Sequence, residues 1–380
     1  NKPLKILITV GIYPPDIGGP ASFVPRIAKL LEENDCEVTV ICLSNEKFLD
    51  HESYKIVRIL RNQNLIIRWI KTVFNMIAYG RNAELIFVNG LPMEAYIANL
   101  FLRKKVIRKV VGDWAWERGR NKGITNDSFD EFQKNKHNLH LEIAKFSRGW
   151  TATKADLVIT PSMHLKEVVK NWGVLENNLK VIYNGTKIQP IIDKKENEVL
   201  HFVTVGRLAP WKNIDKIIQA MALLNEKEFN FIFNIVGSGP LDEKLKKLVT
   251  DLKLENKIFF LGQKNTDELN KIYLNSDIYI QASGYEGLPH VILEAINFNL
   301  TIISTPIGGT NEILLDGKNG WVLNLKEDKA PDEFDLQELI KRVLESKDLD
   351  KEKVLSAKKY LINNFDEEKN LNKYIQFLKS

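Results

Sequence analysis

Short apolar runs alternate along the chain with longer amphipathic stretches. Runs rich in Val, Ile and Leu predict strands at residues 5–10, 37–43, 55–60, 84–89, 106–111, 156–160, 180–183, 201–205, 231–236, 258–261, 277–282 and 300–304. Apolar residues at helical spacing predict helices at residues 21–33, 65–79, 93–102, 139–153, 214–224, 241–252, 268–275 and 334–346, and from residue 289 onward. This alternation is typical of parallel sheets covered by helices, and it predicts two doubly wound α/β units.

The boundary between the two units is expected in a polar segment. Residues 186–198 contain Pro190 and lack periodicity, so we interpret them as a linker between domains at 1–185 and 199–355. The charged tail at 351–378 has a helical pattern. Residues 119–137 are polar, rich in Asn and Lys and without periodicity, which predicts a mobile loop.

Composition narrows the class of protein. A chain of 380 residues with 44% hydrophobic and 27% charged content is long enough for two full cores. Cys36 and Cys42 form neither a metal motif nor a disulfide framework, and we expect buried, reduced thiols of a cytoplasmic protein. The first strand has no sequel typical of a signal peptide, and the apolar stretch 65–79 is too short and too charged to span a bilayer.

Charge is distributed unevenly along the chain. The formal charge is +8 over residues 1–185 and −3 over residues 186–380. A basic first half suits an anionic partner such as lipid head groups, a pyrophosphate-linked lipid or nucleic acid, but an uneven solvated surface explains it equally well. The stretch 65–79, with Arg61, Arg68 and Lys71, can lie on an anionic membrane surface or simply pack on the sheet as an amphipathic helix.

Two glutamates flank the start of one predicted helix. The strand at 277–282 leads into a tight loop that contains Glu286, and the helix that follows contains Glu294. Glu294 lies five residues beyond Pro289, or about 7 Å along the helix axis. The backbone N–H groups of Gly287 and Leu288 have no intrahelical acceptor, so this loop predicts a site for an anion or a hydroxyl. Two solvated surface carboxylates are the alternative.

Two cations follow the first strand of the second half. Arg207 and Lys212 lie between that strand and the next helix. At the carboxyl end of a strand, such a pair can neutralise a diphosphate, including the charge that develops on a departing one. A solvated loop is the commoner fate of such residues, but the recurrence of motifs at this edge favours a binding role.

Glycines recur after several predicted strands. Gly18 and Gly19 precede the first helix, Gly237 follows the strand at 231–236, and Gly262 follows the strand at 258–261. Glycine allows close approach of backbone to a phosphate or a sugar, although each of these glycines can also serve only a turn.

The segment after the strand at 106–111 carries a carboxylate and two aromatic residues. Asp113 can accept a hydrogen bond from a sugar hydroxyl, act as a base, or cap the following segment. Trp114 and Trp116 can stack on an acceptor sugar or belong to the core.

These motifs together resemble the retaining glycosyltransferases of family 4, which have the GT-B fold. Five elements occur in the family's order, from the first glycine loop through the Gly-Arg-Leu element to the loop after the last strand. They comprise Gly18–Gly19, Gly206-Arg207-Leu208 with Lys212, Gly237-Ser238-Gly239, Glu286 with Glu294, and Gly308-Gly309 to Glu312. Many relatives carry a His where this chain has Gly112 or Asp113, so that His role is not transferred.

The resemblance implies a donor site on the second domain and an acceptor site on the first, across a cleft. By this resemblance, Arg207 and Lys212 hold the donor's diphosphate, Glu286 with Gly287 and Leu288 faces the sugar, and Glu294 binds the ribose. Residues 356–380 are expected to form a last helix that returns to the first domain. The implied donor is a UDP-, GDP- or ADP-sugar, and the acceptor is a carbohydrate or a lipid-linked saccharide.

The resemblance also implies a mechanism. By this resemblance, sugar transfer would proceed by front-face attack with retention, without a metal or other cofactor. We expect a cytoplasmic protein that can associate with the cytoplasmic face of a membrane, and no nucleic acid as partner. Two alternatives stay open, a sugar-nucleotide epimerase or hydrolase of the same fold and a non-catalytic sugar-binding module. A dinucleotide oxidoreductase is disfavoured, because no Gly-x-Gly-x-x-Gly follows the first strand.

Overall fold

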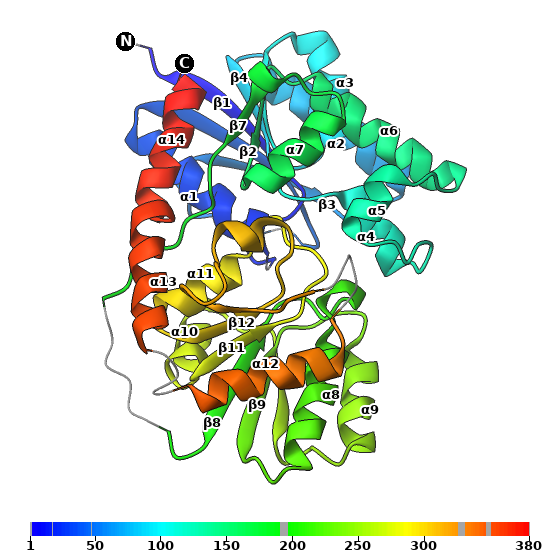
Figure 1. The fold of residues 1–380 in the computed structure, drawn as a ribbon. Helices are drawn as coiled ribbons and strands as arrows, with labels where there is room; N and C mark the ends of the chain where they lie inside the picture. The colour runs from blue at the N-terminus through cyan, green and yellow to red at the C-terminus, as the bar shows by residue number, and fades with distance from the viewer. Residues whose placement is uncertain are drawn as a thin grey trace. The chain divides into compact units, whose positions relative to one another are not determined.

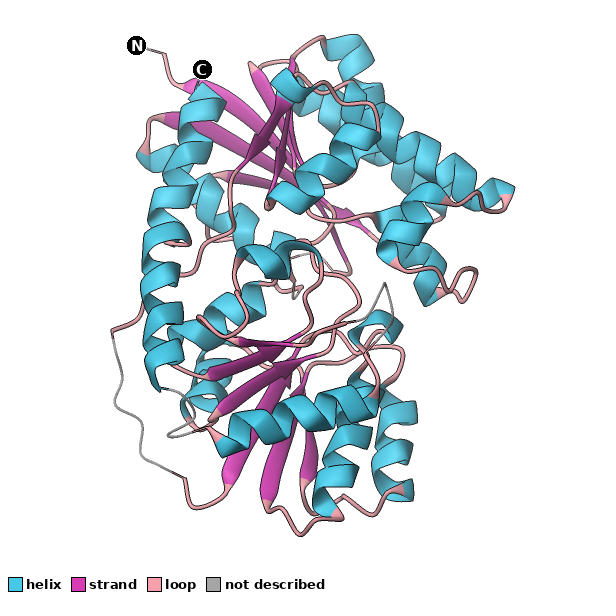
Figure 2. Cartoon of the chain, in the orientation of Figure 1, coloured by secondary structure: helices cyan, strands magenta, loops and turns pink. Residues whose placement is uncertain are grey.

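A computed structural model of the chain describes residues 2–16, 18–46, 48–190, 197–325, 331–346 and 351–379. Contacts between Cα atoms divide the chain into two compact units. The first unit contains Asn1–Ala115, His137–Ile182 and Glu368–Ser380, and the second contains Trp116–Lys136 and Tyr183–Glu367. Figure 1 shows the course of the chain, and Figure 2 shows a sheet with flanking helices in each unit.

The first unit is built on a parallel sheet of seven strands in the order β3-β2-β1-β4-β5-β6-β7. The strands are β1 (Leu4–Val10), β2 (Cys36–Ser44), β3 (Lys55–Leu60), β4 (Leu85–Val88), β5 (Lys105–Lys109), β6 (Leu157–Thr160) and β7 (Leu179–Val181). The helices are α1 (Gly19–Glu33), α2 (Leu65–Gly80), α3 (Pro92–Leu102), α6 (Leu139–Thr153), α7 (Met163–Asn171) and α14 (Glu367–Lys379). One core lies among α1, α14 and the sheet, and a second lies among α2, α3 and the sheet.

The second unit is built on a parallel sheet of six strands in the order β10-β9-β8-β11-β12-β13. Its strands are β8 (Leu200–Val205), β9 (Phe231–Val236), β10 (Ile258–Gly262), β11 (Ile278–Gln281), β12 (Thr301–Ser304) and β13 (Trp321–Val322). Its helices are α8 (Ile214–Asn225), α9 (Asp242–Asp251), α10 (Thr266–Leu274), α11 (His290–Asn297), α12 (Glu333–Glu345) and α13 (Lys351–Asn364). One core includes side chains of α8, α9 and α12, and another includes side chains of α10, α11 and α13.

The strands and helices expected from periodicity are present, with most ends shifted by one or two residues. The prediction of a mobile loop at residues 119–137 is wrong. The range includes the end of α4 (Trp114–Asn121) and all of α5 (Phe129–Lys134). Ser128 and Glu131 form a capping box that starts α5, a local signal that the apolar pattern did not reveal.

The chain ends in two helices rather than one. α13 belongs to the second unit, whereas Tyr374, Ile375 and Leu378 of α14 pack into the core of the first unit. The linker that we predicted at residues 186–198 lies partly outside the described residues. Its first residues, 186–190, belong to the second unit.

Two further expectations concern the cysteines and membranes. Cys36 and Cys42 are free and buried, as expected. Among the described residues, no helix combines the length and the apolar character needed to cross a bilayer.

Candidate active site

The polar motifs of the second half meet at one edge of the second sheet. All neighbouring strands of this sheet run parallel, so the loops that follow β8, β9, β10, β11 and β12 leave the same edge. Such edges bind ligands in open α/β sheets, because loop backbones and helix N-termini converge there. Arg207, Gly237, Ser283 and Thr305 each lie just beyond a strand at this edge, and Gly262 ends β10.

Glu286 is held in place by two neighbours. Its Oε1 atom forms an ion pair with Lys212 Nζ and accepts a hydrogen bond of 2.7 Å from Ser283 Oγ. The side chains of Lys212 and Glu286 are only 17% and 14% exposed, so their attraction is weakly screened by water. A hydrogen bond of 2.6 Å from Gly284 N to Trp211 O ties the two loops together beside this pair.

The double glycine after β12 supports the Glu286 loop. Gly309 N donates a hydrogen bond of 2.9 Å to Glu286 O. A Cβ at Gly308 would overlap Glu286 O, and a Cβ at Gly309 would overlap Gly287 O. Glycine is therefore required at both positions, which gives a physical reason for the Gly308-Gly309 motif. Leu288 is 6% exposed and packs in the core beside α11.

Glu294 lies on α11, the helix that follows this loop. The helix begins at His290 with Pro289 as its N-cap, so Glu294 is about 6 Å further along the axis. Tyr273 Oη donates a hydrogen bond of 3.1 Å to Glu294 Oε2, which orients the half-buried carboxylate.

The loop after β8 combines an exposed cation with close backbone packing. Arg207 is exposed, and its guanidinium makes no ion pair within the part of the chain that the structure describes. A Cβ at Gly237 would overlap Gly206 O, and Gly237 N donates to Gly262 O at 2.9 Å. Gly206, Gly237 and Gly262 thus bring three loop backbones together at this edge.

Residues 116–136 attach to the same loops through aromatic rings. The ring centroid of Trp116 lies 5.2 Å from that of Trp211 and 5.6 Å from that of Tyr285. The Phe129 ring stacks on Tyr285 with a centroid distance of 3.5 Å and an interplanar angle of 7°. This cluster explains why the segment belongs to the second unit, although it follows β5 in the chain.

The aromatic cluster places Glu117 among the charged residues of the site. Trp116, Trp211 and Tyr285 each immediately precede a charged residue, namely Glu117, Lys212 and Glu286. Burial raises the pKa of the Glu117 carboxyl, and nearby Glu286 raises it further. The positive charges of Arg207 and Lys212 act in the opposite direction. Glu117 is thus a carboxylate of the site that the sequence did not reveal.

The sequence contains only weak signals for Glu117 and Ser283, the two residues of the site that it did not predict. Glu117 lies in a short helix of mostly polar residues whose apolar positions contact another part of the chain. Ser283 directly follows the expected strand at 277–282 and stands three residues before Glu286. A polar residue between a buried strand and a motif carboxylate is the one signal that points to Ser283.

Asp113 is placed where it caps a helix. It is 0% exposed, forms an ion pair with Arg148, and accepts a hydrogen bond of 3.0 Å from Ala115 N at the start of α4. This environment favours the capping alternative over contact of Asp113 with an acceptor. Trp116 is 1% exposed and belongs to a core, as in the second interpretation of the tryptophans, whereas Trp114 is 37% exposed.

The first glycine loop belongs to the first unit. Gly18 is the N-cap of α1 at a φ of 155°, and Gly19 is the first residue of that helix. Both glycines lie where the loop that follows β1 meets α1. Within the described ranges, no three or more His, Cys, Asp or Glu side chains group in a way that could hold a metal ion.

The chain is similar to glycosyltransferases and to solved structures over most of its length. HepE of Anabaena, solved in complex with UDP and glucose, matches with a TM-score of 0.78 and 18% identity over 99% of both chains. An uncharacterized glycosyltransferase of Methanocaldococcus jannaschii is 27% identical over 98% of this chain and 97% of its own. A 4-alpha-N-acetylgalactosaminyltransferase of Campylobacter jejuni, named for a diphospho-undecaprenol-linked acceptor, is 25% identical over 71% of this chain and 72% of its own.

Two family models together cover nearly all of the chain. The model of glycosyltransferase family 4 matches residues 17–189. The model of glycosyl transferases group 1 matches residues 186–378, the part that carries the site at the edge of the second sheet. The chain therefore belongs to the glycosyl transferases group 1 and to glycosyltransferase family 4, and it is a glycosyltransferase with the GT-B fold.

Proposed function

We propose that the protein transfers a sugar from a nucleoside-diphosphate sugar to an acceptor hydroxyl with retention of anomeric configuration. The observation that carries this proposal is the group formed by Lys212, Glu286 and Ser283 at the carboxyl edge of the second sheet. A desolvated cation and a fixed carboxylate, 74 residues apart in the chain, suit a donor that carries a diphosphate and a polyhydroxylated ring.

Each polar group has a distinct task in this proposal. Arg207 and Lys212 bind the diphosphate, and Lys212 keeps donors for it because only one is used on Glu286. Glu286 accepts hydrogen bonds from hydroxyls of the donor sugar, and the backbone at Gly287 lies beside it. Glu294 accepts from the ribose hydroxyls. The backbones of Gly237 and Gly262 approach the nucleotide closely.

The reaction follows from the charges that these residues stabilise. The bond between the anomeric carbon and the diphosphate oxygen breaks, and the negative charge that develops on the diphosphate is stabilised by Arg207 and Lys212. The acceptor oxygen attacks the anomeric carbon from the same face, and a departing phosphate oxygen takes the acceptor's proton. In metal-dependent enzymes, metal ions neutralise the charge of the leaving group. Here Arg207 and Lys212 supply that positive charge, so we propose that no metal is needed.

Glu117 extends the proposed site on the side of the sugar. Its carboxylate lies close enough to Arg207, Lys212 and Glu286 to interact with all three. We assign it to a hydroxyl of the donor sugar or of the incoming acceptor, because a carboxylate beside a diphosphate would repel it.

We infer the donor nucleotide and the acceptor from the ligands and substrates for which similar proteins are named. HepE of Anabaena was solved with UDP, which supports a uridine nucleotide as the first donor to test. The Campylobacter jejuni relative is named for a diphospho-undecaprenol acceptor, which supports a lipid-linked saccharide as acceptor. Such an acceptor requires work at a membrane surface, and we propose that the protein acts at the cytoplasmic face without spanning the bilayer.

Substitution with product analysis tests the proposal. We expect Arg207→Ala and Glu286→Ala to abolish transfer while circular dichroism and thermal unfolding show a folded protein. Unchanged turnover in either variant would refute the assignment of these residues. Product analysis with and without acceptor separates transfer from hydrolysis or epimerisation, and complete lack of donor turnover would identify a non-catalytic binding module.

A further inference from the structure

Three neighbouring helices of the first unit expose large apolar side chains. α2 packs beside α3, and α3 packs beside α6, on one side of the first sheet (Figure 1). The exposed apolar residues, which we call the three-helix face, are Leu65, Ile66, Ile67, Ile70, Phe74, Leu100, Phe101, Leu139, Ile143 and Phe146. Each has more than half of its surface exposed, and soluble proteins seldom gather so many such residues on adjacent elements.

The exposed residues follow helical stripes rather than scattered positions. Ile66, Ile70 and Phe74 are spaced by four residues on α2, so they lie on one side of that helix. Their exposed fractions are 69%, 56% and 69%. Leu139, Ile143 and Phe146 on α6 are spaced by four and then three residues, so they also lie on one side of their helix. An amphipathic helix normally turns such a stripe toward a core, so the stripes indicate a surface that another phase or molecule covers.

Aromatic contacts join α6 to α3 within this face. The exposed Phe146 ring stacks on Trp150 with a centroid distance of 6.3 Å, and Trp150 packs edge-on against Tyr96 of α3 at 4.3 Å. Trp150 and Tyr96 are both partly exposed. Tryptophan and tyrosine with one apolar and one wet side are typical of the boundary between a bilayer and water.

The charge around the three-helix face is positive. Residues 53–83 contain six Lys or Arg and no Asp or Glu, and residues 95–112 contain five Lys or Arg and again no Asp or Glu. The exposed cations that make no ion pair within the described part of the chain are Lys71, Arg81, Arg103, Lys105 and Lys154. These charges are therefore available to an anionic partner.

Most of these cations lie along one border of the face. Arg81, Arg103 and Lys154 are the C-cap residues of α2, α3 and α6. The three helices lead into strands β4, β5 and β6 of one parallel sheet, so their carboxyl ends lie at the same sheet edge. Cations stabilise helix C-termini, which accounts for their presence. Glu84 and Asp156 lie at the same edge, just before β4 and β6, but none of these cations forms an ion pair with them within the described part of the chain.

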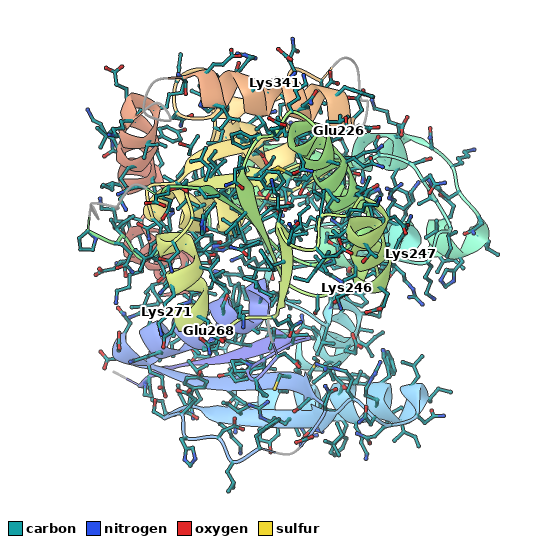
Figure 3. The ribbon with its side chains drawn as sticks, turned by 90° about the horizontal axis from the view of Figure 1, so that it is seen from below. Glu226, Lys246, Lys247, Glu268, Lys271 and Lys341 are labelled. Atoms are coloured by element: carbon teal, nitrogen blue, oxygen red, sulfur yellow. The ribbon has the colours of Figure 1, made fainter. Side chains whose placement is uncertain are left out.

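The helices of the second unit have a different surface. Lys246, Lys247, Glu268 and Lys271 point away from α9 and α10 (Figure 3), and Lys246 forms ion pairs with Asp242 and Glu243. Mixed charges with local pairs are the ordinary surface of a soluble domain. Leu274, at 38% exposed, is the one large apolar residue of α9 and α10 that is exposed, so neither of these two fully described helices has an apolar stripe like those of α2 and α6.

We propose that the three-helix face binds the surface of an anionic lipid bilayer. The inference rests on the proposed function, which requires access to a lipid-linked acceptor. The apolar stripes would lie among the acyl chains just below the head groups, and the cations at the border would contact lipid phosphates. A second copy of the chain is disfavoured as the partner, because a symmetric contact would bring unpaired cations toward their own copies.

Vesicle binding with matched variants tests the proposal. The apolar variant is Ile66→Ser/Phe101→Ser/Phe146→Ser, and its control is Leu175→Ser/Phe334→Ser/Leu355→Ser, which replaces similarly exposed residues elsewhere. The charge variant is Lys71→Gln/Arg103→Gln/Lys105→Gln, and its control is Lys246→Gln/Lys247→Gln/Lys271→Gln. Binding is measured by co-flotation with phosphatidylcholine vesicles that do or do not contain phosphatidylglycerol.

We expect the protein to bind only the vesicles with phosphatidylglycerol, and salt to weaken this binding. The apolar and charge variants should each bind about 100-fold more weakly, whereas both controls should bind like the unmodified chain. Lack of binding by the unmodified chain, or equal loss in variants and controls, would overturn the proposal. A dimer in solution that only the apolar variant dissociates would assign the face to a second copy instead.

The binding of UDP without vesicles distinguishes failure of this inference from failure of the proposed function. The apolar and charge variants should keep the thermal shift that UDP gives the unmodified chain, because the residues at the second sheet are unchanged. Vesicle binding without any effect of nucleoside diphosphates would support the lipid face and contradict the proposed donor site.

Discussion

Replacing Lys212 by methionine removes one charge from the donor site and keeps an apolar stem of similar length. In the structure, Lys212 is the ion-pair partner of Glu286, and both side chains are largely removed from water. The proposed role of Lys212 is to bind the donor diphosphate as well as Glu286. The substitution therefore changes two quantities, the free energy of unfolding and the free energy of the transition state, and these can be measured separately.

The magnitude follows from the burial of the pair. Breaking a fully buried ion pair costs roughly 3–5 kcal/mol, and an exposed pair contributes up to about 1 kcal/mol. With Ser283 Oγ still donating to Glu286 Oε1, we expect Lys212→Met to lower the free energy of unfolding of the second unit by about 1–2 kcal/mol. For transfer, loss of one preorganised charge at the leaving group should lower kcat by about 100- to 1000-fold, or about 2.7–4 kcal/mol.

The double variant Lys212→Met/Glu286→Gln separates the two effects. Glutamine can still accept the hydrogen bond from Ser283, and no unpaired charge remains, so thermal unfolding should return to within about 0.5 kcal/mol of the unmodified chain. Transfer should not return, and the affinity for UDP measured by calorimetry should stay at least about 10-fold weaker. Recovery of transfer together with stability would refute the reasoning, because neither the Lys212 cation nor the Glu286 carboxylate would then be needed for transfer.

Three further substitutions test other parts of the account. Glu117→Gln should lower kcat about 10- to 100-fold. UDP should bind equally well or slightly more tightly, because a negative charge near the diphosphate is removed. Weaker UDP binding in calorimetry would contradict a role on the sugar side. Gly309→Ala should lower the melting temperature and abolish transfer, because its Cβ would overlap Gly287 O and cost about 1–3 kcal/mol; unchanged calorimetric unfolding would argue against the close approach. Lys358 donates a hydrogen bond to Asn297, and burial lowers its pKa to about 8. The pKa of a lysine in an unfolded chain is about 10.4. The unfolded chain thus holds more protons between these values, so stability attributable to Lys358 should rise with pH across this window, and Lys358→Met should flatten the rise in thermal scans.

Local pattern was enough to predict the two parallel sheets and their helices. Buried parallel strands are continuous apolar runs, and the covering helices repeat every three to four residues, so neither signal depends on distant contacts. Local pattern also predicted that Arg207 and Glu286 lie in loops after strands and that Glu294 lies on the helix after the second loop, which the structure confirms. Their binding of a donor stays a prediction.

The segment after β5 was the part that local pattern could not predict. Trp116 and Phe129 pack on Trp211 and Tyr285, which are more than 80 residues away in the chain, so the apolar positions do not repeat at helical spacing within the segment itself. The same long-range packing determines that Glu117 lies near Lys212. A single sequence carries no local signal for such a contact.

Asp113 illustrates a second limit of prediction from sequence. An aspartate just after a strand fits both a catalytic base and a helix cap, because both roles use the same hydrogen-bond acceptor. Only burial and the ion pair with Arg148 distinguish the two, and both depend on α6, which lies 26 residues beyond Asp113 in the chain.

The central proposal is that the second unit binds a nucleoside-diphosphate sugar and that the sugar is transferred with retention of its anomeric configuration. It is tested most directly by incubating the protein with UDP-sugars and a polyprenyl-diphosphate-linked saccharide, and by determining UDP release and the anomeric configuration of the product by NMR. The account predicts UDP release in equal amount to a glycoside with the donor's configuration, and loss of both in Arg207→Ala and Glu286→Ala. A product of inverted configuration, or equal UDP release by the variants, would contradict it.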